Sequence, residues 1–195
     1  MKLAARACWP LLAALLALLA LATWALPQAW SSAIDWQPAL ALRQPWRAFS
    51  AALLHLSAQH LLANLAGCAV LALLGWTIRM PARACQAWLL AWPLTQLGLL
   101  ARPALQHYGG LSGVLHAGVM LVVLTLLARR GRESLIGALI LIGLLAKLYL
   151  EDPLGPLLQA REDWDILIAP IAHLSGVLAA LVSAAIVKGL GLGKG

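Results

Sequence analysis

Charged residues are scarce in this sequence. They make up 11% of the 195 residues, only 7 residues are acidic, and hydrophobic residues reach 63%. A soluble domain carries roughly 25% charged residues, so this chain has too little charge to cover a surface exposed to water. A soluble globular enzyme, a disordered chain and a nucleic-acid-binding module are therefore excluded, in spite of the net charge of +7. The composition indicates an integral membrane protein.

Cysteine is scarce as well. The three cysteines, Cys8, Cys68 and Cys85, are odd in number and lie in or beside apolar stretches without CxxC spacing. This pattern predicts neither a disulfide framework nor a zinc site. We expect all three to act as small apolar packing residues, and we expect no metal and no cofactor.

Long apolar runs account for most of the chain. Runs of about 20 residues cross a hydrocarbon core of roughly 30 Å. They predict six transmembrane helices at about 8–26, 58–78, 84–100, 111–128, 134–150 and 165–187. The predicted fold class is an all-α polytopic membrane protein, in which residues 1–195 form a single membrane domain.

Lysine and arginine are distributed unevenly among the predicted loops. Four lie in the first, third and fifth loops, and nine lie at the N-terminus, in the second and fourth loops and in the C-terminal tail: Lys2, Arg6, Arg79, Arg83, Arg129, Arg130, Arg132, Lys188 and Lys194. Cytoplasmic loops are enriched in these residues, so both termini are predicted to be cytoplasmic. Lys147, near the end of the fifth helix, is expected to extend outward.

Two segments near the N-terminus allow more than one interpretation. The first apolar run follows two basic residues, as in a signal peptide. It is long for a signal peptide, and its removal would leave five helices with the wrong polarity, which favours a retained helix. Segment 28–52 contains Trp30, Trp36 and Trp46 and is expected to lie in the membrane interface.

Polar side chains are costly inside a bilayer, so those within the predicted helices are candidates for function. Ser112 begins the fourth helix between Gly110 and Gly113, and His173 lies in the sixth, both in the predicted outer half of the bilayer. A serine hydroxyl needs a base to accept its proton. Because no carboxylate is expected at this depth, we predict a Ser–His dyad, with Gly113 and Gly176 allowing close helix approach. Taken singly, Ser112 and His173 are each also compatible with a role in helix packing alone.

The second predicted helix supplies two further polar residues. His60 and Asn64 lie one turn apart on one face of it and enter from the same side of the membrane. Together with the backbone N–H of Ser112, they can donate hydrogen bonds to the oxyanion of an acyl transfer. His116, one turn after Ser112, is an alternative base, but helix geometry favours a supporting contact with His173.

The sequence resembles the rhomboid family of intramembrane serine proteases. Over about residues 40–185 it has, in the family's order, Trp46-Arg47, the HxxxN pattern of His60 and Asn64, Tyr108-Gly109-Gly110-Leu111-Ser112-Gly113, and Ala172-His173 followed by Gly176. The resemblance implies a six-helix bundle with Ser112 as nucleophile, His173 as base, and His60 and Asn64 as oxyanion donors. Two positions depart from the family: Ala180 replaces a glycine, and His116 replaces an aromatic residue that stacks on the base.

Two features resemble the rhombosortase branch of bacterial rhomboids. One is the sequence from Ser112 to His116, and the other is that no soluble N-terminal domain is expected. That resemblance implies a protease of the bacterial inner membrane, with its active site opening to the periplasmic or outer side. It also implies membrane-anchored protein substrates with a glycine-rich motif, a transmembrane helix and a basic tail. The partners expected are these substrates and the lipid bilayer, with no nucleic acid, and the oligomeric state is left open.

Two other functions are alternatives to the protease. A catalytically inactive rhomboid-like protein would bind membrane segments without cutting them, but such proteins usually lose the serine or the histidine. A transporter would show broken helices in paired halves or charges at the midplane. Loop 151–164 leads directly to the helix of His173 and is expected to cover the site and to move when substrate enters. A passive connector is the alternative for this loop.

Overall fold

The computed structural model describes residues 2–191, which are helical apart from loops and two isolated β-bridges. The α-helices are α1 (Lys2–Trp24), α2 (Ser31–Ile34), α3 (Arg47–Ser50), α4 (Ala58–Thr77), α5 (Ala82–Leu97), α6 (Ser112–Leu127), α7 (Arg132–Glu151) and α8 (Pro170–Gly189). Short 3-10 helices lie between them: η1 (Gln28–Trp30), η2 (Pro38–Leu40), η3 (Ala51–Leu53) and η4 (Gly98–Ala101). The predicted all-α class is confirmed.

Helix boundaries agree with the sequence patterns for α4 to α7, within three residues at each end. The first helix begins earlier than predicted, at Lys2, and the prediction of a last helix from residue 165 is wrong at its start, because α8 begins at Pro170. Proline is favoured at the first helical position, and it disfavours helical geometry in the residue before it. The residues before Pro170 are extended, since Ile168 pairs with Gln159 in a β-bridge.

Within residues 2–191, four helices are long and apolar enough to cross a membrane: α4, α7, α8 and α1 over Ala7–Trp24. The apolar helix α6 and the helix α5 have 16 residues each. At about 1.5 Å per residue, such a helix measures about 24 Å, less than the roughly 30 Å of a hydrocarbon core. The chain is a multi-pass membrane protein. That it crosses the membrane six times stays a prediction.

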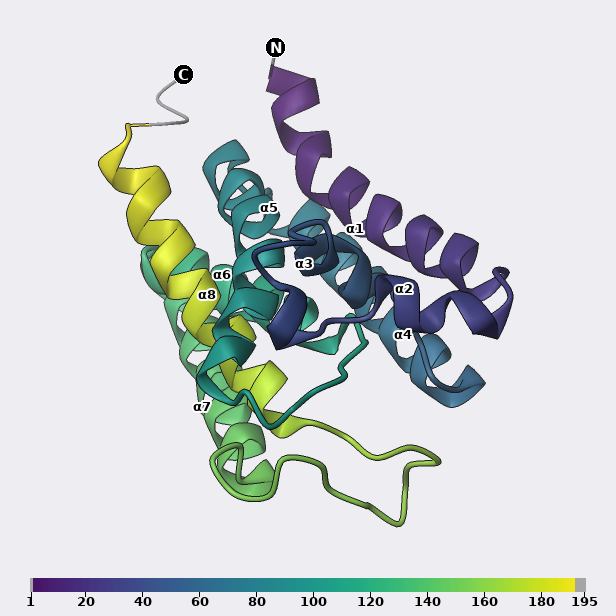
Figure 1. Ribbon diagram of the computed structural model, residues 1–195. Helices are drawn as coiled ribbons and strands as arrows, with labels where there is room; N and C mark the ends of the chain where they lie inside the picture. Colours follow the sequence, from purple (N-terminus) through teal and green to yellow (C-terminus); the bar gives the residue numbers. More distant parts are fainter. Residues whose placement is uncertain (1, 192–195) are drawn as a thin grey trace.

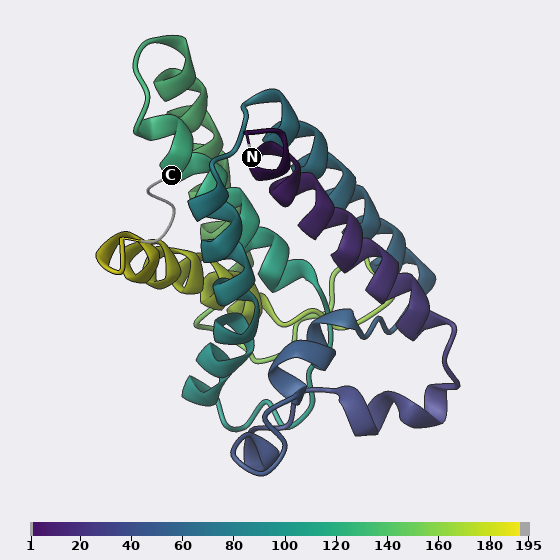
Figure 2. The same ribbon diagram turned by 90° about the horizontal axis from the view of Figure 1, so that it is seen from above.

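Helix α6 lies at the centre of the bundle. It contacts α4, α5, α7 and α8, and apolar residues are buried along all its faces, as expected of a central helix. On one flank α1 lies beside α4, and on the other flank lie α7 and α8 (Figures 1 and 2). In α7 only Gly137, Leu144, Leu148 and Glu151 are buried. The peripheral α7 therefore depends on few contacts for its position.

Two buried tryptophans join the first four long helices. Trp9 of α1 stacks on Trp88 of α5 with ring centroids 4.4 Å apart. The Nε1–H of Trp9 donates to the carbonyl of Leu71 at 2.9 Å, and that of Trp88 donates to the carbonyl of Val114 at 2.8 Å. A Cβ at Gly75 would lie 2.0 Å from the Trp9 ring, so glycine is needed where α1 and α4 meet. These contacts bury large apolar rings without leaving a polar N–H unpaired.

The segment between α1 and α4 packs against the protein. Trp36 is completely buried, in contact with a small apolar cluster that includes Leu99, and its backbone pairs with that of Tyr108. Trp30 and Trp46 are more than half exposed. The expectation that all three tryptophans lie in the membrane interface is therefore wrong for Trp36, because the backbone pairing draws it into the protein.

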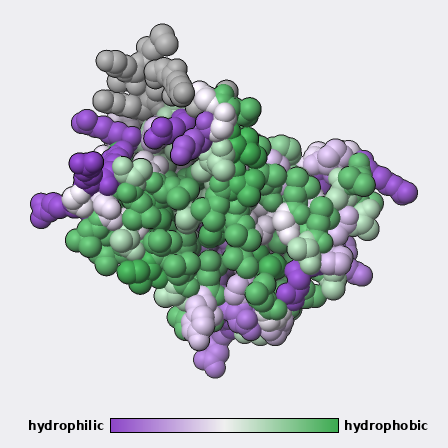
Figure 3. Space-filling model, turned by 90° about the vertical axis from the view of Figure 1, so that its left-hand side faces the viewer, coloured by the Kyte–Doolittle hydropathy of each residue, from purple (hydrophilic) through white to green (hydrophobic). Residues whose placement is uncertain are grey.

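Apolar side chains cover much of the outer surface. Figure 3 shows a continuous apolar area across the side of the molecule on which α7 and α8 lie, with hydrophilic residues gathered at its edges. The start of α1 and the end of α8 lie at one end of the molecule, and loop 152–169 lies at the other (Figure 1). Of the basic residues on which the predicted orientation rests, Lys194 and the side chains of Lys2 and Arg6 lie outside the described residues.

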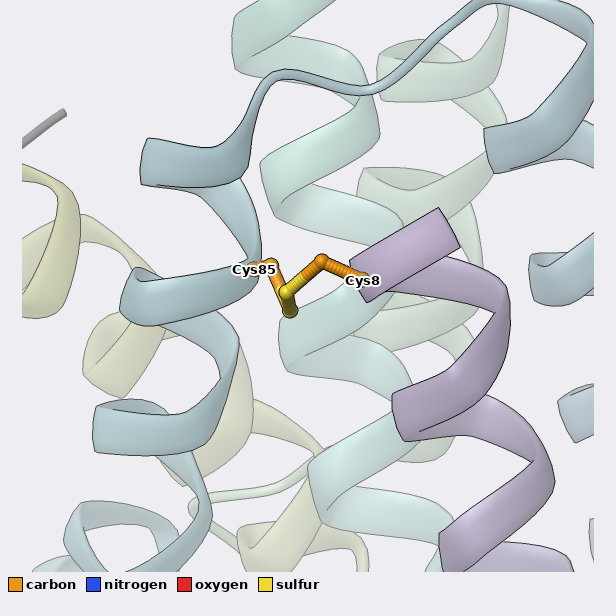
Figure 4. Close-up of a disulfide and its surroundings, with 2 residues drawn as sticks. All are labelled: Cys8 and Cys85. Atoms are coloured by element: carbon orange, nitrogen blue, oxygen red, sulfur yellow. A yellow bond between two sulfur atoms is a disulfide. The ribbon is translucent and has the colours of Figure 1, made fainter. Parts of the chain in front are cut away.

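A disulfide joins Cys8 of α1 to Cys85 of α5 (Figure 4). The prediction that all three cysteines serve only as packing residues is wrong for this pair, and it holds for Cys68, which is buried and free. The two bonded cysteines are 77 residues apart in the chain. Only the packing of α1 against α5 brings them together, so no local spacing could have revealed the bond.

We expect alkylation to distinguish the cysteines. In denatured protein that has not been reduced, iodoacetamide should modify Cys68 alone, because Cys8 and Cys85 have no free thiol. Prior reduction should raise the count to all three, as read by intact mass spectrometry. A Cys68→Ser variant is the control and should take up no label before reduction. Modification of all three cysteines without reduction would contradict the bond.

Candidate active site

Two helix starts bring a serine and a histidine into contact. Ser112 is the first residue of α6, and His173 is the fourth residue of α8. Ser112 Oγ lies 3.0 Å from His173 Nε2, within hydrogen-bonding distance. Because Ser112 begins its helix, its backbone N–H has no acceptor within the helix. The site thus combines a hydroxyl bonded to an imidazole with a backbone N–H that has no acceptor within α6.

Close contact of two glycines sets this distance. A Cβ at Gly176 of α8 would lie 1.9 Å from the carbonyl oxygen of Gly113 on α6. A Cβ at Gly113 would lie 2.6 Å from the carbonyl oxygen of Ala172. The two backbones therefore touch next to Ser112 and His173, as small residues allow at helix contacts in membranes.

A cavity of about 670 Å³ opens beside Ser112. His60, Asn64, His116 and His173 line it, so the structure brings together all the polar residues that the sequence analysis selected. Most of the remaining lining is apolar: Leu56, Ala63, Gly67, Gly109, Leu115, Val119, Leu158, Ile166, Leu167, Ile168 and Ala169.

His60 and Asn64 face the cavity from α4. The amide of Asn64 donates to the carbonyl of His60 at 3.0 Å, which leaves one of its two N–H groups available. A Cβ at Gly110 would lie 3.0 Å from His60 Nε2, and Gly110 has a φ of +148°, which side chains disfavour. Glycine therefore allows the chain before Ser112 to pass against the His60 ring.

His55 and Tyr108, which lie next to His60 and Ser112, are both uncharged. Burial lowers the pKa of His55, whose Nδ1–H donates to the carbonyl of Leu53 at 2.9 Å, and its ring centroid lies 4.9 Å from that of His60. Burial raises the pKa of Tyr108 to about 12. Both side chains are neutral at physiological pH, and neither adds a charge to the cavity.

A carboxylate also reaches the histidine. Glu151, the last residue of α7, accepts a hydrogen bond from His173 Nδ1 at 2.7 Å, and both side chains are buried. The prediction that no carboxylate lies at this depth is wrong, because α7 ends level with the start of α8. Lys147, one turn earlier, extends toward the end of α7, where its ammonium donates to Glu151. The i, i+4 spacing of these two residues is the sequence signal that could have revealed the pair.

His116 stacks on His173. The ring centroids are 4.2 Å apart with planes inclined by 12°, and His116 Nδ1 donates to the carbonyl of Ser112 at 2.7 Å. The structure therefore places His116 against one face of the His173 ring.

Ligand atoms of His116, Glu151 and His173 lie within 4.8 Å of one another, close enough for a metal ion. The lone pair of an imidazole nitrogen lies in the ring plane, and a single ion cannot lie in the planes of two stacked, nearly parallel rings. In addition, both Nδ1 atoms already take part in hydrogen bonds. The cluster fits a hydrogen-bonded arrangement and does not fit a metal site.

The family model of the rhomboid domain matches residues 42–189 of the chain. The chain belongs to the rhomboid family. Members of this family are generally intramembrane serine proteases. No curated protein and no solved structure matches the chain.

In this rhomboid the Trp46-Arg47 motif orders the first loop. Arg47 is buried and donates to the carboxylate of Asp35 at 2.9 Å and to its carbonyl at 2.8 Å. The other carboxylate oxygen of Asp35 bonds His107 Nδ1 at 2.6 Å. Because His107 precedes the Tyr108–Gly113 motif, this network ties the first loop to the segment that leads into Ser112.

The loop after α7 lies across the cavity of the rhomboid. Trp164 lines the cavity, and its ring lies edge-on to His60 with centroids 6.2 Å apart. Two hydrogen bonds attach the loop to the start of α4: Ser57 to Asp165 at 2.7 Å, and Gln59 to the carbonyl of Asp163 at 2.7 Å. The loop thus covers the site between α4 and α8, as predicted, and the side of the membrane that it faces stays a prediction.

Replacing Gly176 by alanine should separate α6 from α8. The new methyl group would overlap the carbonyl of Gly113, and overpacking typically costs about 1–3 kcal/mol. We expect a clear drop in Tm of the detergent-solubilised rhomboid. Gly189→Ala is the matched control, because Gly189 lies on the same helix with open space around it. Equal Tm values for the two variants would contradict the close contact.

Proposed function

We propose that this rhomboid is an intramembrane serine endopeptidase in which Ser112 is the nucleophile and His173 the general base. The observation that carries the proposal is the 3.0 Å contact between Ser112 Oγ and His173 Nε2 at the wall of a large, mostly apolar cavity. A serine becomes nucleophilic when an adjacent base accepts its proton. The contact supplies that base.

The reaction follows from these positions. Ser112 Oγ attacks the carbonyl carbon of the substrate peptide bond while its proton passes to His173 Nε2. The tetrahedral intermediate collapses when His173 returns the proton to the leaving amine nitrogen. Water then attacks the acyl-enzyme, with His173 again accepting a proton, and Ser112 is regenerated.

We assign the oxyanion site to His60, Asn64 and the backbone N–H of Ser112. Both side chains line the cavity that holds Ser112, and the N–H is unpaired within α6. Donors that are already in place stabilise the developing negative charge most where water is excluded. The apolar lining of the cavity provides such surroundings.

We further propose that the substrates are transmembrane segments of membrane-anchored proteins, cut on the outer side of a bacterial inner membrane. The distribution of Lys and Arg supports six crossings with both termini cytoplasmic. Consistent with this orientation, the site and the loop that covers it lie at the end opposite to the start of α1 and the end of α8 (Figure 1). The sequence from Ser112 to His116 supports the rhombosortase branch, and with it glycine-rich C-terminal sorting anchors as substrates.

A fluorophosphonate probe tests the proposal directly. We expect the probe to label the wild-type protein in detergent, and labelling to disappear in Ser112→Ala and His173→Ala, as measured by in-gel fluorescence. The matched control is Ser183→Ala, since Ser183 is a completely buried serine of α8 without a hydrogen-bond partner in the described structure. Labelling that survives Ser112→Ala would refute the assignment. Absence of labelling in the folded wild type would favour an inactive, segment-binding rhomboid.

Each oxyanion donor should contribute only part of the stabilisation of the oxyanion. His60→Ala and Asn64→Ala should each lower the maximal labelling rate by about 10²-fold or less, because the remaining donors still stabilise part of the charge. Leu62→Ala is the control, since Leu62 lies on the same helix and its side chain is exposed. Unchanged rates in both single variants and in the double variant would show that the oxyanion is bound elsewhere.

A further inference from the structure

Glu151 is the carboxylate that the dyad interpretation does not use. Its Oε2 accepts from Nδ1 of His173 at 2.7 Å, and the opposite nitrogen of the same ring lies 3.0 Å from Ser112 Oγ. Glu151 and His173 are 7% and 8% exposed, respectively. Serine, imidazole and carboxylate thus form one continuous row, contributed by three different helices.

We propose that Glu151 is a positioning residue that turns the proposed dyad into a Ser–His–Glu triad. The inference rests on the proposed function of Ser112 and His173. A carboxylate can only accept a hydrogen bond, so its contact requires the proton of neutral His173 to be on Nδ1. Nε2 then presents its lone pair to the Ser112 hydroxyl. Glu151 thereby selects the tautomer in which His173 acts as a base.

Charge is the second contribution of Glu151. When His173 accepts the proton of Ser112, a positive charge appears in a buried, mostly apolar site, where an isolated charge is costly. The carboxylate lies next to the ring that becomes charged. It therefore stabilises the imidazolium in the transition state more than the neutral imidazole in the resting protein, as the third group of a serine triad does.

Lys147 and Gln159 hold Glu151 in place. Lys147 donates to Oε1, the carboxylate oxygen that His173 does not use, so both oxygens are paired and the carboxylate cannot rotate freely. The side-chain amide of Gln159 donates to the backbone carbonyl of Glu151 at 2.9 Å and thereby attaches the loop to the end of α7. The ammonium also offsets the negative charge of Glu151 before the reaction, which lowers the cost of burying it.

His173 is therefore held on three sides. Ser112 and Glu151 bind its two nitrogens in the ring plane, and His116 covers one face at 4.2 Å. The alternative is that Glu151 serves only as a structural ion pair with Lys147. A structural role predicts a loss of stability without a change in the reactivity of Ser112, whereas a positioning role predicts a change in reactivity.

The test compares Glu151→Gln and Glu151→Asp with Glu133→Gln. Glu133 is the matched control because it lies at the opposite end of α7 and pairs with Arg129 outside the site. The first measurement is the kinetics of fluorophosphonate labelling, separated into the maximal rate and the probe concentration at half-maximal rate. The second is the proton resonance of His173 Nδ1–H in protein labelled with [15N]histidine, assigned by its loss in His173→Ala.

We expect Glu151→Gln to lower the maximal labelling rate by about 10²- to 10⁴-fold, as removal of the carboxylate does in serine triads, while the half-maximal concentration stays unchanged. Glu151→Asp should recover part of the rate, since it keeps the charge at a longer distance. Glu133→Gln should match the wild type. The Nδ1–H resonance should be strongly deshielded in the wild type, because hydrogen bonds to carboxylates are short and strong, and should lose this deshielding in Glu151→Gln.

Wild-type labelling rates in Glu151→Gln, together with no labelling of Ser112→Ala, would overturn the triad and leave the proposed protease intact. If the folded wild type is not labelled at all, the proposed function fails, and the resonance alone decides whether Glu151 holds His173. If Glu151→Gln does not fold, Glu151→Asp decides: a rate at least tenfold below wild type supports the positioning role, and a wild-type rate overturns it.

Discussion

Gly113 of α6 and Gly176 of α8 lie so close that a methyl group on either one would overlap the backbone of the other helix. Membrane helices gain little from excluding water, and their association depends on tight packing of small residues. Here that packing also sets the distance between Ser112 and His173, which lie in the first turns of the two helices. The hydrogen bond between the hydroxyl and the imidazole therefore depends on a contact in which neither residue takes part.

A polar site inside an apolar bundle has to satisfy its own hydrogen bonds. Lys147, Glu151, His173 and Ser112 do so in sequence, each bonded to the next. Removing Glu151, for example, leaves Nδ1 of the buried His173 without its acceptor, which costs more than the bond itself contributes. Hydrogen bonds thus connect the groups of the proposed chemistry, although α7, which supplies two of the four groups, is the least buried of the four long apolar helices.

Much of the fold and part of the site could be predicted. The length and spacing of the apolar runs located α4 to α7 to within three residues, because chain length and bilayer thickness constrain where apolar helices occur. Ser112, His173, His60 and Asn64 were selected for a similar reason, since polar residues are rare in such helices. Glu151 was missed because it ends a helix, and a charge at that position is ordinary when only the sequence is considered. The Cys8–Cys85 bond was missed because its two partners are 77 residues apart.

The sequence by itself determined that this protein is a helical membrane protein of the rhomboid type, since hydropathy and motif order are properties of the chain alone. Tertiary structure decided which groups meet: Cys8 with Cys85, Trp36 with Tyr108, and Glu151 with His173. Each of these pairs joins segments that are distant along the chain or separated by a loop. Their proximity follows from the packing of helices and loops against one another, which sets distances that no local pattern of residues specifies.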